Sequence, residues 1–213
     1  MENYKKNLEI LKKNHVYSEE MEHDACGVGL IASTEGKKSR KVVEYGIEAL
    51  KAVWHRGAVD ADGKTGDGAG IHVEIPKDFF IEKIEVTGHS YDNSEICVGM
   101  IFLPRNDYAA QESCKTIVES ELTKNDFSIY GWRQVPVNPK VLGEKAFQTM
   151  PEIIQVLFKS NNPELLNKDL ERKIYETRRI IENKAFQVSL NNFYICSLSS
   201  KSIIYKGMFL AEA

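Results

Sequence analysis

The hydrophobic pattern of the chain alternates between segments with helical spacing and short apolar segments typical of strands. In one segment, apolar residues recur at Val43, Ile47, Leu50 and Trp54, which places them on one side of a helix. Residues 96–103 are instead almost continuously apolar, which indicates a well-buried strand. The same criteria predict helices over about 39–55, 108–123, 140–149 and 163–184, and strands over 26–32, 71–75, 96–103, 127–137, 153–158, 193–198 and 202–208.

This set of elements predicts an α+β or α/β protein. The spacing of the strands suits hairpins and so favours antiparallel sheets packed with helices. The last two strands are expected to form a hairpin around Ser199-Ser200-Lys201, and Asp107 is expected to cap the helix that follows it.

The first 25 residues form a polar leader, charged throughout and without the apolar stretch of a secretory signal. The character of the chain changes at Cys26. If 26–32 is a strand, Cys26, Val28 and Leu30 share one face, while Gly27 and Gly29 leave the other face nearly bare. Bare backbone of this kind permits another segment or a ligand to approach closely.

Composition narrows the classes of function. The chain of 213 residues carries a formal charge of −3, which argues against a nucleic-acid binder. No apolar run approaches the roughly 20 residues of a membrane span. The four cysteines are widely separated, so we expect neither a zinc site nor a disulfide framework, but reduced thiols in the cytoplasm.

Two motifs imitate ligand-binding loops. Gly63-Lys64-Thr65 looks like the end of a P-loop, but Ala58 stands where the first glycine is required. Asp60-Ala61-Asp62-Gly63 resembles a calcium loop, but Lys64 occupies the position of the next oxygen ligand. Neither motif predicts a bound ligand.

Three further segments carry weak signals when each is taken alone. Cys26 has the ordinary interpretation of a small buried hydrophobe, and His55-Arg56-Gly57 that of a helix end with basic residues and a terminal glycine. In Thr65-Gly66-Asp67-Gly68-Ala69-Gly70, the glycines are more than a turn needs, which suggests backbone packed closely against another segment.

Together these segments closely resemble the start of the glutamate synthase large subunit, a class II glutamine amidotransferase domain with the N-terminal-nucleophile hydrolase fold. The resemblance extends from about residue 22 to the C-terminus. The segments that carry it are Glu22-His23-Asp24-Ala25-Cys26-Gly27-Val28-Gly29, His55-Arg56-Gly57-Ala58, Thr65-Gly66-Asp67-Gly68-Ala69-Gly70-Ile71, Gly131-Trp132-Arg133-Gln134-Val135-Pro136-Val137 and Tyr205-Lys206-Gly207-Met208.

The resemblance implies an αββα sandwich of two mainly antiparallel sheets flanked by helices. It implies that Cys26 is the nucleophile that hydrolyses L-glutamine to glutamate and ammonia through a thioester, and that the ammonia serves glutamate synthesis from 2-oxoglutarate. The base in such an enzyme is the free α-amine of the nucleophile. Residues 1–25 are therefore expected to be a propeptide, cleaved between Ala25 and Cys26, and 26–213 the amidotransferase part. Arg56 and Gly57 match the supporting loop beside the nucleophile.

The sequence departs from the family pattern in three respects. The family forms its oxyanion hole with an Asn-Gly pair, and this chain contains no such dipeptide. The later arginine and aspartate that bind the substrate are also missing. We therefore expect the fold to be incomplete at its C-terminus. No metal is expected in this chain, and FMN, an iron–sulfur cluster, the remaining domains and a small subunit are expected only of a longer glutamate synthase.

Three interpretations of the chain remain open from the sequence. It is part of a longer glutaminase, or it is a short, catalytically inactive homologue that acts as a binding or assembly module. In the third, it is a different thiol hydrolase that uses Cys26 with His55.

Overall fold

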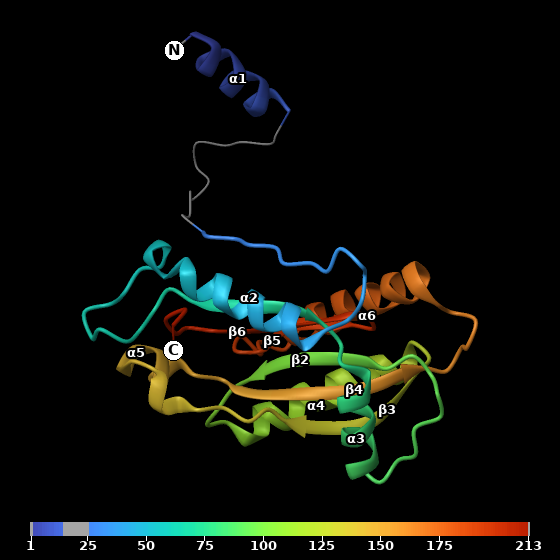
Figure 1. The fold of residues 1–213 in the computed structure, drawn as a ribbon. Coiled ribbons are helices and arrows are strands. Elements are labelled where there is room, and N and C mark those ends of the chain that lie inside the picture. The colour runs from blue at the N-terminus through green and yellow to red at the C-terminus, as the bar shows by residue number, and fades with distance from the viewer. Residues whose placement is uncertain (1, 15–25, 213) are drawn as a thin grey trace.

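The computed structural model describes residues 2–14 and 26–212 (Figure 1). Within them the helices are α1 (Glu2–Lys13), α2 (Arg40–Ala52), α3 (Lys77–Val86), α4 (Tyr108–Lys124), α5 (Glu144–Thr149) and α6 (Asn167–Gln187), with 3-10 helices η1 (Trp54–Arg56) and η2 (Pro139–Val141). The strands are β1 (Ala69–Glu74), β2 (Cys97–Leu103), β3 (Phe127–Gln134), β4 (Glu152–Ser160), β5 (Tyr194–Ser199) and β6 (Ser202–Gly207). None of the described helices is long and apolar enough to cross a membrane.

The larger sheet has four strands in the order β3-β4-β2-β5, and each neighbouring pair is antiparallel. β2 lies inside it, with Val98 opposite Leu157 of β4 on one side and opposite Ser199 of β5 on the other. A strand flanked on both edges and covered on both faces needs apolar residues at nearly every position. The predicted strand over 96–103 is therefore confirmed.

The smaller sheet pairs β1 with β6, which come from distant parts of the chain; Ile71 lies opposite Tyr205 and Val73 opposite Ile203. The hairpin expected between the last two strands is wrong, because β5 pairs with β2 in the larger sheet and β6 with β1 in the smaller one. The turn between β5 and β6 carries the chain from one sheet to the other. A short turn brings two strands together, but each strand pairs with the edge that its side chains best complement.

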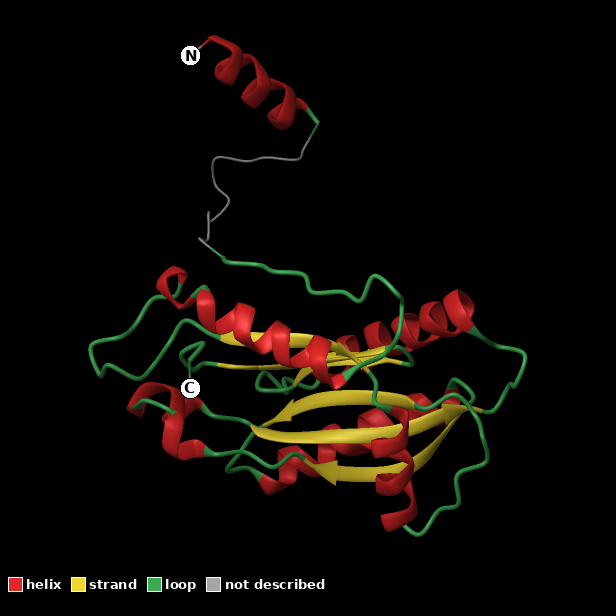
Figure 2. Cartoon of the chain, viewed as in Figure 1, coloured by secondary structure: helices red, strands yellow, loops and turns green. Residues whose placement is uncertain are grey.

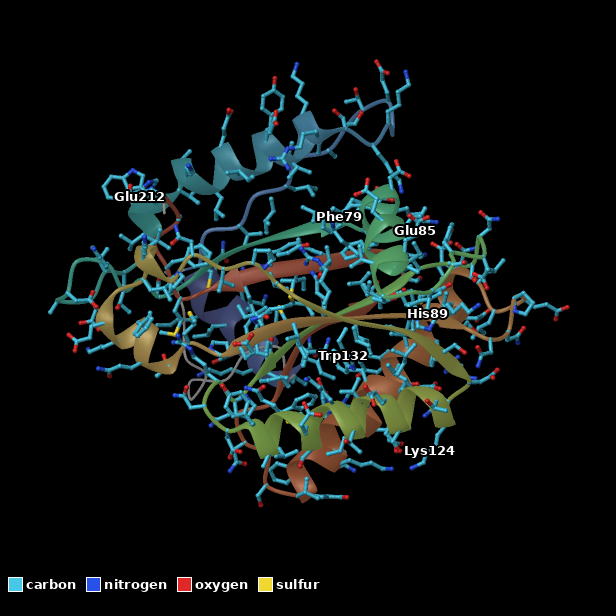
Figure 3. The ribbon with its side chains drawn as sticks, turned by 90° about the horizontal axis from the view of Figure 1, so that it is seen from below. Phe79, Glu85, His89, Lys124, Trp132 and Glu212 are labelled. Carbon is cyan, nitrogen blue, oxygen red and sulfur yellow. The ribbon has the colours of Figure 1, made fainter. Side chains whose placement is uncertain are left out.

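Helices α4 and α6 cover the outer face of the four-stranded sheet and lie against each other (Figure 3). Val118 and Leu122 of α4 and Ile174 and Ile181 of α6 are completely buried there, with Phe158 of β4. The predicted cap of α4 is confirmed, since the side chain of Asp107 accepts a 2.9 Å hydrogen bond from the backbone N–H of Ala110.

The inner face of the four-stranded sheet packs against the smaller sheet and α3. Phe80 and Ile84 of α3 and Ile203 of β6 are fully buried against Val98 and Met100 of β2. Helix α2 covers the smaller sheet and contacts β1 (Figures 1 and 2). The layers are therefore helix, sheet, sheet, helix, and the prediction of an α+β sandwich of two antiparallel sheets flanked by helices is confirmed.

The expected strand over 26–32 is wrong. This segment pairs with no strand among the described residues. The side chains of Val28 and Leu30 are 91% and 90% exposed. Alternating apolar side chains make a segment suitable for a sheet, but a strand also needs a neighbouring edge to pair its backbone groups.

The remaining differences are two helices that were not predicted, α1 and α3, and the boundaries of several elements. Helix α3 follows Pro76 and was not predicted, because its apolar residues continue directly from those of β1. The expected helix over 39–55 is divided into α2 and η1, and that over 140–149 into η2 and α5. Helix α6 begins at Asn167 rather than at Pro163.

A buried carboxylate joins α4 to α6. The side chain of Glu121 is only 5% exposed and accepts hydrogen bonds from Lys184 (2.6 Å) and Lys124 (3.0 Å). The hydrogen bond from Lys184 is the largest influence and lowers the pKa of Glu121; burial opposes it, and Lys124 adds to the lowering. A carboxylate whose pKa is lower in the folded chain stabilises the fold above its unfolded value of about 4.3 and loses that effect as the pH falls.

We therefore expect Glu121→Gln to lower the melting temperature by several degrees at pH 7 and by progressively less below pH ~4.3. Melting curves from pH 7 to pH 3 measure this. Glu112→Gln is the matched control on the same helix, because Glu112 is 72% exposed in its ion pair with Lys115 and is expected to contribute under about 1 kcal/mol. Equal effects of the two variants at pH 7 would contradict a special role for the buried carboxylate.

Candidate functional site

An open cleft of about 2220 Å³ lies between the two sheets at one end of the sandwich. Its walls are the ends of β1, β2 and β6, helix α5, the loop after η1 and the C-terminal segment 208–212. These segments gather at the left of Figure 1, near the end marked C. The cleft joins parts of the chain that are far apart in sequence.

Cys26 and Gly27 line this cleft, and the thiol of Cys26 is exposed. The other three cysteines, Cys97, Cys114 and Cys196, are buried. Burial raises the pKa of the thiol in each of them, to about 11 in Cys114. Because the thiolate is the reactive form, these three are inert hydrophobes. The ordinary interpretation of a cysteine as a small buried hydrophobe therefore holds for these three and not for Cys26.

The segment His55-Arg56-Gly57 forms the end of η1 and the turn after it. The backbone N–H of Gly57 donates to the carbonyl of Trp54 at 3.0 Å, which closes the turn. Gly57 and Trp54 line the same cleft as Cys26, so the structure brings two of the predicted segments together. His55 is exposed and does not line the cleft; its ring contacts the edge of Trp54.

Two of the predicted site features fall outside what is described. Ala25, on the leader side of the expected cleavage point, belongs to the undescribed residues 15–25. The backbone of Arg56 is placed in η1, but its side chain is not described.

The glycine-rich loop makes the close contacts that its composition predicted. A Cβ atom on Gly66 would lie 2.7 Å from the carbonyl oxygen of Phe209, and one on Gly70 would lie 2.7 Å from that of Tyr205. Gly68 has a φ of +120°, a conformation that favours glycine. The loop can therefore lie flat against β6 and the C-terminal segment, which closes this side of the cleft.

We expect Gly66→Ala to destabilise the fold by about 1–3 kcal/mol, because the new methyl group meets backbone atoms that cannot move aside. Chemical denaturation of the purified chain measures the change. The matched control is Gly29→Ala, since a Cβ there meets nothing within 4 Å. A Gly66→Ala variant as stable as the Gly29→Ala variant would show that the loop does not press against the C-terminal segment.

Two cations also line the cleft. The guanidinium of Arg105 lies 4.8 Å from the centre of the Phe147 ring, and the ammonium of Lys206 donates to the hydroxyl of Tyr194 at 2.7 Å. Among the described residues, the carboxylates of Asp67, Asp107 and Glu212 line it as well, so the cleft presents charges of both signs. Sequence reasoning did not identify either residue, since a single Arg or Lys has no motif around it.

Helix α5 is a further part of the site that the sequence did not reveal. It borders the cleft through Ala146, Gln148 and Thr149. It also contacts the loop over 60–65: Lys145 forms a 2.6 Å ion pair with Asp60. The feature of the sequence that could have indicated this contact is the Asp60-Ala61-Asp62-Gly63 motif, whose carboxylates bind groups within the chain.

The comparison with protein families agrees with this geometry. The family model of the class II glutamine amidotransferases matches residues 26–213 and thus begins at Cys26 itself. The chain belongs to the class II glutamine amidotransferases.

The relatives identify the branch of the family to which the chain is similar. It is 54% identical over 209 residues to the glutamate synthase [NADPH] large chain of Azospirillum brasilense; the match covers 98% of this chain and 14% of the relative. It is 40% identical to the ferredoxin-dependent glutamate synthase 1 of Arabidopsis thaliana, over 90% of this chain and 12% of that protein. A third relative, from Pyropia yezoensis, is 39% identical over 93% of the chain. The chain thus spans about one seventh or less of the length of these relatives.

Proposed function

We propose that this chain is the glutaminase portion of a glutamate synthase and that Cys26 is its nucleophile. The observation that carries the proposal is the position of Cys26. It is the first residue matched by the amidotransferase family model, and it is an exposed cysteine on the cleft, whereas the other three are buried.

The proposed reaction proceeds in two steps. The thiolate of Cys26 attacks the side-chain amide carbon of L-glutamine, the C–N bond breaks, and the nitrogen takes a proton and leaves as ammonia. Water then attacks the resulting thioester, which releases glutamate and restores the thiol. We assign Arg56 and Gly57 a supporting role beside the nucleophile, because Gly57 lines the same cleft as Cys26. A cation beside Cys26 would favour its thiolate.

The free amine of Cys26 is the proposed base. In the chain as it stands, that nitrogen forms an amide bond with Ala25 and cannot accept a proton. We therefore propose that residues 1–25 are a propeptide removed between Ala25 and Cys26. Two comparisons support this: the family model begins at Cys26, while the match to the Azospirillum chain extends ahead of it.

The wider reaction is proposed from the relatives. Their names describe glutamate synthases, so the ammonia would serve glutamate synthesis from 2-oxoglutarate in further domains, with a small subunit as a second partner. We assign FMN and the iron–sulfur cluster to those domains. A cluster needs several converging cysteines, and the described residues contain no group of three or more metal-binding side chains. The unpaired cysteines suit a reducing compartment such as the cytoplasm.

A glutamine-like electrophile tests the nucleophile. Incubated with 6-diazo-5-oxo-L-norleucine, the chain is expected to lose residues 1–25 and to gain one adduct on Cys26, as the C–S bond forms and dinitrogen leaves. Intact mass and peptide mapping measure both changes. Cys26→Ala is expected to gain no adduct.

The control is Cys196→Ser, which alters a buried thiol and leaves the nucleophile in place. It is expected to be labelled as efficiently as the parent chain. An adduct on another cysteine would reject Cys26 as the nucleophile. A folded chain that stays unlabelled would reject the proposal and favour the alternative of an inactive binding or assembly module.

The proposed base predicts a pH dependence. An α-amine has a reference pKa of about 7.7–8.0, and only its neutral form accepts a proton. The rate of labelling after removal of the leader is therefore expected to rise through this range. A rate that shows no rise between pH 7 and pH 8.5 would contradict the α-amine as base.

A further inference from the structure

The residues after Gly57 form a closed loop. The backbone N–H of Asp67 donates to the carbonyl of Ala58 at 3.3 Å, and that of Asp60 donates to the carbonyl of Thr65 at 2.9 Å. Val59 and Gly66 form an antiparallel bridge between these two bonds. The base of the loop adjoins Gly57, because a Cβ there would lie 3.3 Å from a carboxylate oxygen of Asp67. The loop and the end of η1 therefore lie next to each other.

The carboxylate of Asp62 holds the tip of this loop. One of its oxygens accepts from the backbone N–H groups of Thr65 (2.7 Å) and Lys64 (2.9 Å), and the other accepts from the hydroxyl of Thr65 at 2.6 Å. The backbone of Glu144, the first residue of α5, lies near enough to add to the lowering of the pKa of this carboxylate. These hydrogen bonds hold the pKa of Asp62 well below its usual range, and the bond from the Thr65 hydroxyl lowers the pKa most. Asp62 therefore stays ionised at neutral pH.

The tip is fitted closely against the start of α5. A Cβ on Gly143 would overlap with the hydroxyl oxygen of Thr65 and with a carboxylate oxygen of Asp62. Thr65 is 5% exposed, and the ion pair between Lys145 and Asp60 flanks it. This part of the fold admits only a glycine at position 143.

These contacts connect two walls of the cleft. Gly57 and Ala58 line it on one side, and Ala146 of α5 lines it on the other. The Asp-Ala-Asp-Gly motif joins them, because Asp60 forms an ion pair with Lys145 of α5 and the carboxylate of Asp62 lies against Gly143, which precedes that helix. The segment Asp60-Ala61-Asp62-Gly63, which resembles a calcium loop, thus connects the loop after η1 to α5.

We propose that Asp62 is a positioning residue for the reaction at Cys26. It fixes the loop over 58–67 to α5 and thereby holds Arg56 and Gly57 beside the nucleophile. This inference rests on the proposed function, since it assigns Asp62 a role in the chemistry of the same cleft. Asp62 itself does not line the cleft, so it acts through the segment that it holds.

Asp62→Asn tests the role with little change in shape. The amide replaces one accepting oxygen with a donor, so the bonds from Lys64 and Thr65 cannot all form. Two measurements follow: hydrogen exchange of the backbone amides over 54–67, and the rate of labelling of Cys26 by 6-diazo-5-oxo-L-norleucine as its concentration is varied. We expect faster exchange at Gly57, Asp60 and Asp67, and a maximal labelling rate about 10- to 100-fold lower, with the half-saturating concentration nearly unchanged.

Asp92→Asn is the matched control. The carboxylate of Asp92 also accepts several hydrogen bonds, from Ser94, Tyr130 and Lys159, in a loop that does not line the cleft. Its pKa is likewise lowered, chiefly by the hydrogen bond from Lys159. The control is expected to lose comparable thermal stability without changing exchange over 54–67 or the labelling of Cys26. A purely structural effect would slow labelling equally in both variants.

The outcomes separate this inference from the proposed function. If the parent chain is labelled at Cys26 and Asp62→Asn is labelled equally fast, the positioning role is wrong while the nucleophile stands. If the parent chain is not labelled, the proposed function fails. Unchanged hydrogen exchange over 54–67 in Asp62→Asn would separately show that Asp62 does not hold the loop. Slower labelling without faster exchange would show that Asp62 does not act through the loop, and it would also reject the positioning role.

Discussion

Strand β2 is buried from every side, and the rest of the sandwich depends on this constraint. Its edges pair with β4 and β5, while its side chains alternate between two cores: Cys97, Ile101 and Leu103 face α4 and α6, and Val98 and Met100 face α3 and β6. Position 99 of this strand has room only for glycine, because a Cβ there would lie 2.6 Å from side-chain atoms of both Leu198 and Val156. A strand this enclosed requires a layer on each face.

The cleft follows from the two-layer arrangement of the sheets. The smaller sheet covers only part of the inner face of the larger one, and the space left between them is bounded by loops and by α5. Glycines allow these loops to approach the backbone of β6 and the C-terminal segment closely. The loop over 58–68, which contributes one part of the cleft wall, is therefore held by backbone contacts and hydrogen-bonded carboxylates, because it contains few large apolar side chains.

The same architecture divides the four cysteines into three buried thiols and one exposed thiol. Three occupy β2, α4 and β5, where the core surrounds them and raises the thiol pKa. Cys26 precedes the first layer of the sandwich and stays exposed on the cleft. Burial thus excludes three candidates, and exposure leaves one thiol for chemistry.

The sequence by itself determined what depends on neighbouring residues: the apolar run of β2, the cap at Asp107 and the crowding of glycines after Thr65. The similarity of several segments to one family also located Cys26. Only the tertiary structure decided which strands pair, because the partner of an edge lies elsewhere in the chain. Hence 26–32 pairs with no strand of the part of the chain that the structure describes, and β5 and β6 separate into two sheets. It likewise decided that Asp60 binds Lys145 of α5 and that Asp62 lies against Gly143 just before that helix, since a carboxylate acquires its role from the groups that the fold brings to it.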